Sequence, residues 1–203
     1  MLYAYQFFRR YNDKDEISRM NEDIEEILIS EERILSKVQE LGRQITRDYQ
    51  GRKLLLVGTL KGAVPFIADL ARAIHLPVEL DYMAVASYGN STQSSGIVRI
   101  IKDLEGPIDD KHVLVVEDII DSGLTLHYLV DLLKRRNPLS LRICSLLNKE
   151  RERIRDVEVD YLGFTIPDKF VVGYGLDCAQ RYRNLPYIGI LKPTVYGPGS
   201  GID

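Results

Sequence analysis

The sequence predicts an α/β fold in which a mostly parallel, twisted sheet is flanked by helices. Short apolar segments of strand length recur along the chain, and they alternate with segments whose apolar residues repeat at helical spacing. Strands that are apolar nearly throughout are typical of a parallel sheet that helices cover on both faces. Ligands bind beyond the carboxyl ends of the strands in such sheets. We therefore expect a functional site in the loops that follow the strands.

Three segments carry the marks of helices. Ser30 precedes two glutamates, as an N-cap precedes acids in a first helical turn. Apolar residues then recur at helical spacing until Gly51, and these are Ile34, Val38, Leu41 and Ile45. Pro65 stands where the first turn of a helix tolerates proline, which predicts a helix to about Ile74. The third helix is expected at 124–136.

The remaining apolar segments predict the strands. They are 53–57, 78–86, 97–101, 113–116 and 141–147, with short strands near 161–164, 170–172 and 187–191. Residues 1–19 mix aromatic and charged side chains without a sustained period. We interpret them as an N-terminal extension of a domain that covers residues 20–203, with Met20 as a possible alternative start.

The composition favours a soluble protein of the cytoplasm, and it does not exclude a small anionic substrate. With 27 basic and 30 acidic residues the net charge is −3, which argues against a broad nucleic-acid surface. Two distant cysteines form no disulfide framework or metal pair. The apolar stretches are far too short for a membrane span, and the charge order at the start is the reverse of a signal peptide's. The three histidines show no metal or triad spacing.

The most informative stretch covers residues 113–125. Glu117, Asp118 and Asp121 follow an apolar strand, and burying three carboxylates together is costly, so an exposed ledge is expected. Ser122 to Thr125 then open a helix whose free N–H groups, hydroxyls and dipole suit a phosphate. A sugar phosphate with free hydroxyls meets both demands. A polar turn or a response-regulator-type acidic pocket are the alternatives, and the latter would not need the phosphate-binding turn.

This stretch resembles the phosphoribosyl-pyrophosphate motif of the type I phosphoribosyltransferases, in the form found in hypoxanthine-guanine phosphoribosyltransferases. The resemblance extends from about Glu22 to Tyr196. It implies the family's fold, including a small hood subdomain built from the N-terminal part and about 165–203. It also implies a glycosyltransferase of purine salvage. Such an enzyme transfers the 5-phosphoribosyl group from phosphoribosyl pyrophosphate to hypoxanthine or guanine, giving IMP or GMP and pyrophosphate. Mg²⁺ and a homodimer or homotetramer are implied as well.

The resemblance assigns roles within the acidic loop. Glu117 and Asp118 would bind the ribose hydroxyls and, together with Asp177, the metal. Asp121 would face purine N7 as the general base. The turn that holds the 5′-phosphate would consist of Ser122, Gly123, Leu124 and Thr125. Some family members carry Lys where Leu124 stands.

Two further loops resemble parts of the family's site. In 58–63, Lys61 and Gly62 would bind pyrophosphate after a cis peptide at Leu60–Lys61, although Ala63 stands where some members carry Gly. Arg183 would reach the same pyrophosphate, and Arg181 is the weaker candidate. Residues 87–96 resemble the flexible active-site loop, in which Ser87 and Tyr88 would close over the substrates and exclude water.

The purine would be bound by three residues. Lys149 alone would be interpreted as solvated surface, but by resemblance it donates to purine O6, which discriminates against adenine. Phe170 would stack on the base, and Val171 would contact its edge through backbone groups. Two alternatives stay open: a regulator that uses the fold as a ligand sensor, which would need a nucleic-acid surface, and another base specificity. Preference among hypoxanthine, guanine and xanthine is not determined by the sequence.

Overall fold

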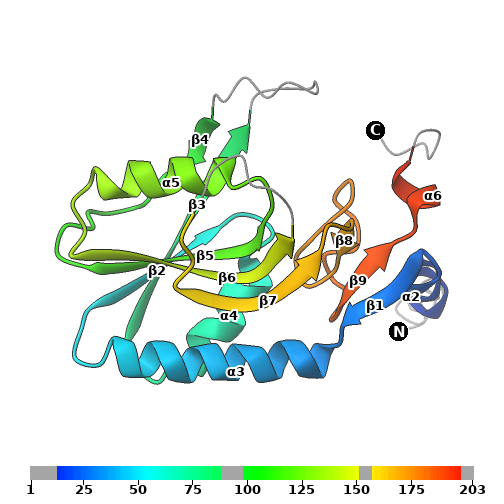
Figure 1. Ribbon diagram of the computed structural model, residues 1–203, viewed down its shortest axis with the longest axis horizontal. Coiled ribbons are helices and arrows are strands. Elements are labelled where there is room, and N and C mark those ends of the chain that lie inside the picture. The colour runs from blue at the N-terminus through cyan, green and yellow to red at the C-terminus, as the bar shows by residue number, and fades with distance from the viewer. Residues whose placement is uncertain (1–12, 88–97, 151–156, 198–203) are drawn as a thin grey trace, which may run out of the picture.

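The computed structural model describes residues 13–87, 98–150 and 157–197, and it contains two sheets (Figure 1). The larger sheet has six strands in the order β4-β3-β2-β5-β6-β7. Their bounds are β2 Leu54–Thr59, β3 Val78–Ser87, β4 Val98–Lys102, β5 His112–Ile120, β6 Ser140–Glu150 and β7 Tyr161–Pro167. All neighbouring pairs are parallel except the antiparallel pair β3–β4. The predicted mostly parallel sheet is confirmed.

Helices cover both faces of the large sheet. Figure 1 shows α3 (Glu31–Asp48) and α4 (Val64–Ala73) on one face and α5 (Leu124–Lys134) on the other. Every residue of β2 is buried, as expected of a central parallel strand. One core cluster joins α3 and α4 to the sheet, and a second lies beneath α5. The predicted cap of α3 is also confirmed, since Ser30 Oγ accepts a hydrogen bond from the Arg33 N–H at 3.5 Å.

The smaller sheet joins segments from opposite ends of the chain. Its order is β1 (Ile24–Ile29), β9 (Ile188–Leu191) and β8 (Val171–Val172), and both pairs are antiparallel. Figure 1 shows this sheet beyond the carboxyl ends of β5, β6 and β7, with α2 (Asp13–Glu22) and α6 (Pro193–Tyr196) beside it. The sequence did not predict β1, α2 or α6. Helix α2 runs through Met20, and the division of the chain at that residue remains a prediction.

The other predicted helices and strands are present, with shifted ends. The largest shift concerns β5, which was expected to end at Val116 but continues through the acidic residues to Ile120. Among the described residues, no helix is both long and apolar enough to cross a membrane.

Candidate active site

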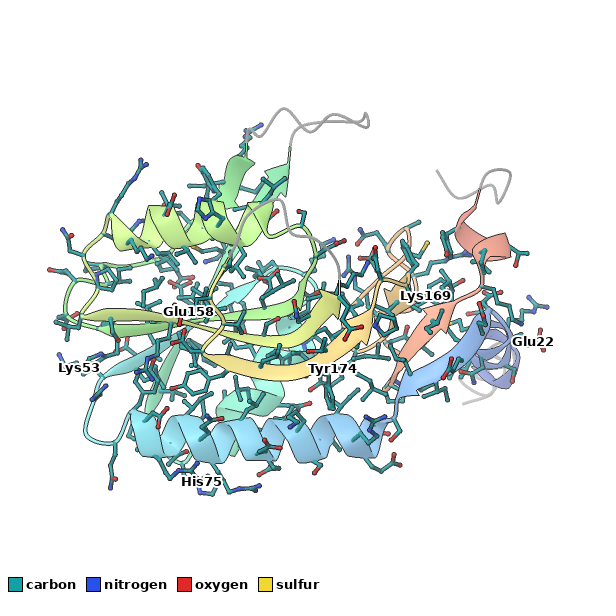
Figure 2. All side chains as sticks on the ribbon, in the orientation of Figure 1. Glu22, Lys53, His75, Glu158, Lys169 and Tyr174 are labelled. Carbon is teal, nitrogen blue, oxygen red and sulfur yellow. The ribbon has the colours of Figure 1, made fainter. Side chains whose placement is uncertain are left out.

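Four segments meet at the carboxyl ends of the central strands. They are the turn after β2, the end of β5 with the start of α5, the ends of β6 and β7, and residues 173–183. Figure 2 shows Tyr174 and Lys169 toward the end of the large sheet that faces the small sheet, whereas Lys53 lies at the opposite end. An added Cβ on Gly175 would lie 2.0 Å from the carbonyl oxygen of Gly62, so these two loops are in direct contact.

Glu117 and Asp118 form a pair of neighbouring, half-buried carboxyl groups. Burial raises the pKa of Glu117 to about 8, with a further contribution from the neighbouring Asp118 carboxylate. Burial also raises the pKa of Asp118 to about 6, although its hydrogen bond from the Ile119 N–H and the nearby Arg183 oppose the shift. Thr59 donates a hydrogen bond of 2.5 Å to Glu117 Oε2.

The predicted ledge is only partly exposed: Glu117 and Asp118 are half-buried, whereas 47% of the Asp121 side chain is exposed. The strand does not end before Glu117 and Asp118, and loops from distant parts of the chain partly cover these two acids. An added Cβ on Gly62 would lie 1.6 Å from Asp118 Oδ2, which measures how closely the turn after β2 approaches the carboxylate. A side chain at position 62 would clash with this carboxylate, so the glycine allows the turn to approach Asp118.

The turn after the acids opens into a small cavity at the start of α5. Gly123 is the N-cap residue, with a left-handed backbone (φ 76°) that favours glycine. The Leu124 N–H donates to Ser122 Oγ at 3.5 Å. Because the N-cap residue is a glycine, it has no side chain that could accept a hydrogen bond from the first turn of α5. The cavity has a volume of about 150 Å³ and is lined by Glu117, Ile119, Ile120, Asp121, Ser122, Gly123, Thr125 and Leu126. A free helix N-terminus beside hydroxyls can bind an anion.

Lys61 and Arg183 lie together on the other side of the acid pair. The Leu60–Lys61 peptide is cis, as the resemblance implied. Arg183 Nη2 lies 2.7 Å from Asp177 Oδ1, and its Nη1 donates to the carbonyl oxygen of Gly175 at 2.7 Å. The Arg183 Nε is buried and has no hydrogen-bond partner among the described residues. Arg181 instead is exposed and lies over the ring of Tyr182, with 5.3 Å from its guanidinium carbon to the ring centroid.

Lys149 lies between two carboxylates at the ends of three consecutive strands. Its Nζ is 3.5 Å from Asp121 Oδ2, after β5, and 3.5 Å from Asp168 Oδ1, after β7. Only 13% of the Lys149 side chain is exposed, so it is not the solvated lysine that its sequence position alone would indicate. It is held at the site, beside the predicted general base.

Phe170 offers an aromatic face near these groups. Its ring stacks on Tyr196, with 4.6 Å between ring centroids and 19° between the planes, and 37% of Phe170 is still exposed. Its carbonyl oxygen accepts from the Leu191 N–H, and Val171 pairs with Ile190, so β9 fixes the backbone here. One face of the phenyl ring is supported by Tyr196, and exposed ring surface is left for a ligand.

For two predicted site residues the structure describes no side chain, and four residues that contact the site were not predicted. Tyr88 lies outside the described residues, and Ser87 is the last residue of β3, without a described side chain. Thr59, Asp168, Gln180 and Tyr196 contact predicted site residues but were not identified from the sequence. The β2–β5 register pairs Gly58 with Val116 and so brings the next residues, Thr59 and Glu117, side by side; this register is known only from the structure.

A divalent cation fits the acid pair. Among the described residues, no three His, Cys, Asp or Glu side chains are arranged as a complete set of metal ligands. Mg²⁺ commonly uses one or two protein carboxylates and takes its other oxygens from water and substrate phosphates. Glu117 and Asp118, whose raised pKa values reflect burial without enough positive charge, provide such a partial set, with Asp177 nearby.

The chain is similar to proteins of one family along most of its length. A family model described as the phosphoribosyl transferase domain matches residues 24–179. The hypoxanthine-guanine phosphoribosyltransferase of Bacillus subtilis is 56% identical over 177 residues, covering 87% of this chain and 98% of that protein. The chain belongs to the phosphoribosyltransferase family. Its predicted fold is that of the family: a hypoxanthine phosphoribosyltransferase structure from Staphylococcus aureus superposes with a TM-score of 0.85 at 50% identity, covering 87% of this chain and 96% of that one.

Other phosphoribosyltransferase relatives are much longer than this chain. The bifunctional protein TilS/HprT of Listeria monocytogenes is 55% identical over 177 residues, which cover 87% of this chain but 27% of that protein. The chain therefore spans about a quarter of the length of these bifunctional relatives.

Proposed function

We propose that this chain transfers the 5-phosphoribosyl group of phosphoribosyl pyrophosphate to hypoxanthine or guanine, giving IMP or GMP and pyrophosphate. The observation that carries the proposal is the placement of an acid pair beside a helix N-terminus. Glu117 and Asp118 can accept hydrogen bonds from ribose hydroxyls, and the turn from Ser122 to Thr125 can donate to the 5′-phosphate. One sugar phosphate would thus be bound at both ends.

The far end of the site suits a 6-oxopurine. Lys149 is a largely covered donor next to Asp121, and Phe170 provides an aromatic face that Tyr196 supports. A lysine donor matches an oxo group at purine C6 and opposes the amino group of adenine. This arrangement favours a purine enzyme over a pyrimidine enzyme, and it supports catalysis over a ligand sensor, which would not need residues for a base.

For this reaction the protein has to position the two substrates, shield the site from water and accept a proton. The purine nitrogen attacks C1 of the ribose, and the bond from C1 to the pyrophosphate oxygen breaks. Lys61 and Arg183, which share a contact with Gln180, would stabilise the charge of the leaving pyrophosphate, and Asp121 would take up the proton that the purine loses. Mg²⁺, held by Glu117 and Asp118 with Asp177 nearby, would supply additional positive charge at the pyrophosphate.

The assembly and location of the protein are also proposals. By the family resemblance we infer a homodimer or homotetramer, and a cytoplasmic location is supported by the two free cysteines, Cys144 and Cys178, both of which are buried. Burial raises the pKa of both thiols, which suits inert side chains rather than nucleophiles.

A base panel tests the proposed function. The protein is mixed with phosphoribosyl pyrophosphate, Mg²⁺ and one of hypoxanthine, guanine, xanthine, adenine or uracil, and the mononucleotide and pyrophosphate formed are measured. We expect turnover with hypoxanthine or guanine, and kcat/KM for adenine and uracil lower by about 10⁴. Binding of phosphoribosyl pyrophosphate without product from any base would instead identify a ligand sensor.

Replacing Lys149 tests the base-binding end of the site. We expect Lys149→Ala to raise KM for hypoxanthine at least tenfold and KM for phosphoribosyl pyrophosphate far less, because of the two substrates only the base would contact the lysine. Lys134→Ala, an exposed lysine of α5, serves as the control and should leave both values unchanged. Equal increases in the two KM values for Lys149→Ala would contradict the assigned role.

A further inference from the structure

The side chain of Gln180 bridges the two cations of the site. Its Oε1 accepts a hydrogen bond from Lys61 Nζ at 3.2 Å and from Arg183 Nη2 at 3.3 Å. Lys61 follows β2, whereas Arg183 belongs to the segment 173–183, so a single oxygen joins two distant parts of the chain. Lys61 and Arg183 are the cations that the proposed function assigns to pyrophosphate. The amide oxygen therefore contacts both groups that a pyrophosphate oxygen would contact.

The backbone that carries Gln180 is firmly held. Its N–H donates to Asp177 Oδ2 at 2.8 Å, and Cys178 and Arg181 exchange two backbone hydrogen bonds across the turn. Ala179, Gln180 and Tyr182 have positive φ values of 48°, 65° and 73°, a conformation that non-glycine residues adopt only when the surroundings impose it. The position of the turn is thus specified, while the Gln180 side chain itself is exposed and can rotate away.

The charges of the three groups determine what this bridge can do. Two cations that point at one place repel each other, and Asp177 Oδ1, 2.7 Å from Arg183 Nη2, compensates part of the Arg183 charge. The neutral amide oxygen between Lys61 and Arg183 accepts hydrogen bonds from both without adding further negative charge. Hydrogen bonds from cations to a phosphate oxygen are roughly twice as strong as those to a neutral acceptor. An incoming phosphate oxygen would therefore displace the amide. A carboxylate in its place would compete with the phosphate.

We propose that Gln180 is a positioning residue: its side-chain oxygen holds Lys61 and Arg183 on a common point and gives way to an oxygen of pyrophosphate. The inference rests on the proposed function, because that function assigns pyrophosphate to the two cations. It concerns the binding of pyrophosphate alone, so it can be tested without a purine base.

The experiment measures the affinity of pyrophosphate in the presence of Mg²⁺ by calorimetry. The proteins are the wild type, Gln180→Ala, Gln180→Glu and the control Gln39→Glu, which adds the same charge at an exposed position of α3. We expect Gln180→Ala to weaken binding about threefold to tenfold, because the cations are no longer held together. Gln180→Glu should weaken it further, by about 10²-fold, and most at low ionic strength. The control should bind as the wild type does.

Each result decides a separate question. Failure of the wild type to bind pyrophosphate would refute the proposed function before any variant is compared. Binding by the wild type together with unchanged or tighter binding by Gln180→Ala would overturn the positioning role alone. Gln180→Glu that binds as well as Gln180→Ala would show that the side chain does not contact the phosphate position. Unchanged thermal unfolding and an unchanged KM for hypoxanthine in both variants would separate the positioning role from a merely structural one. A KM that rises for the base as much as for phosphoribosyl pyrophosphate would count against the positioning role.

Discussion

At the scale of single residues, the half-buried pair Glu117 and Asp118 shapes the electrostatics of the site. Both pKa values are raised, mainly by burial, and one hydrogen bond from Thr59 only partly compensates Glu117. Carboxyl groups in this state gain most from a ligand that brings positive charge or hydroxyl donors. The pair is therefore better suited to receive a metal-bound sugar than to stabilise the fold.

Asp121 can be tested as the residue that accepts the proton. We expect Asp121→Asn to lower kcat about 10²–10⁴-fold, as loss of general base catalysis does, and to leave the binding of phosphoribosyl pyrophosphate nearly intact. Steady-state kinetics with hypoxanthine and calorimetry with phosphoribosyl pyrophosphate give the two quantities. Asp131→Asn, an exposed change on α5, is the control. An unchanged kcat for Asp121→Asn would remove Asp121 from the mechanism.

Gly62 can be tested as the residue that lets the turn after β2 approach the acid pair. We expect Gly62→Ala to weaken binding of phosphoribosyl pyrophosphate at least tenfold, because the new Cβ would lie 1.6 Å from Asp118 Oδ2 and must push the turn or the carboxylate away. Gly106→Ala is a matched control, since nothing lies within 4 Å of its added Cβ. Wild-type affinity in Gly62→Ala would show that the turn tolerates displacement.

The sequence predicted the identity of these residues better than their surroundings. The string from Glu117 to Thr125 is contiguous, so its acids and its helix start could be recognised together. The partial burial of the acids could not, because Gly62 and Arg183 reach them from other parts of the chain. Gln180 and Tyr196 were missed for the same reason: each contact joins residues that only the folded chain brings together.

At the scale of elements, close packing of α3 against α4 underlies one face of the large sheet. Gly42 lies in the middle of α3, and an added Cβ there would be 2.5 Å from both the Cβ and the carbonyl oxygen of Ala73, the last residue of α4. The absence of a side chain thus lets the two helices approach each other. The position of α4 matters to the site, because α4 follows directly from the turn that carries Lys61 and Gly62.

This contact reverses the usual effect of replacing glycine by alanine in a helix. Alanine normally stabilises a helix interior by about 1 kcal/mol relative to glycine. We expect Gly42→Ala instead to lower the free energy of unfolding by about 1–3 kcal/mol through overpacking. Urea denaturation measures the change, with Ser36→Ala on the exposed side of α3 as a control that should stay within about 0.5 kcal/mol. A stabilised Gly42→Ala would mean that the helices can separate without cost.

The elements were predicted where their own residues specify them. Helix α3 carries its N-cap, its acidic first turn and its apolar period within one segment, and all were found as predicted. Strand β1 was missed because two exposed glutamates interrupt its apolar residues. In the described part of the chain it pairs with β9 alone, near the other end of the sequence. Long-range pairing of this kind leaves little local signal.

At the scale of the whole molecule, the site lies between two sheets that the chain assembles from distant parts. The large sheet supplies the acids, Lys61 and Lys149. The segments around the small sheet supply Phe170 and Arg183, and β9 returns to the N-terminal β1, where the Lys192 N–H donates to the carbonyl oxygen of Asp23. Residues 1–12 lie outside the described part of the chain, and their role stays a prediction.

The raised pKa of the half-buried Glu117 makes the stability of the metal-free protein depend on pH. The folded-state pKa of Glu117, about 8, lies above its ordinary value of 4.5, so the folded state binds this proton more tightly than the unfolded state. The resulting stabilisation is complete below about pH 4.5 and is lost as the pH rises through about 8. We expect the free energy of unfolding to fall over this range more steeply in the wild type than in Glu117→Gln.

Comparison of the two proteins isolates the contribution of Glu117. Burial lowers the pKa of His112, which adds a slope of opposite sign up to about pH 6.5, but this slope is common to both proteins. Urea denaturation at a series of pH values gives the difference. Saturating Mg²⁺ with phosphoribosyl pyrophosphate should reduce it by favouring the ionised acids. Parallel curves for wild type and Glu117→Gln would show that Glu117 is ionised normally in the folded protein.

The central claim is that one sugar phosphate is bound at its hydroxyls by Asp118 and at its phosphate by the turn that contains Thr125. Calorimetric titration of phosphoribosyl pyrophosphate with Mg²⁺ into the wild type, Asp118→Asn and Thr125→Val tests it most directly. We predict that each variant, correctly folded, binds at least tenfold more weakly than the wild type. Wild-type affinity in either variant would contradict the claim.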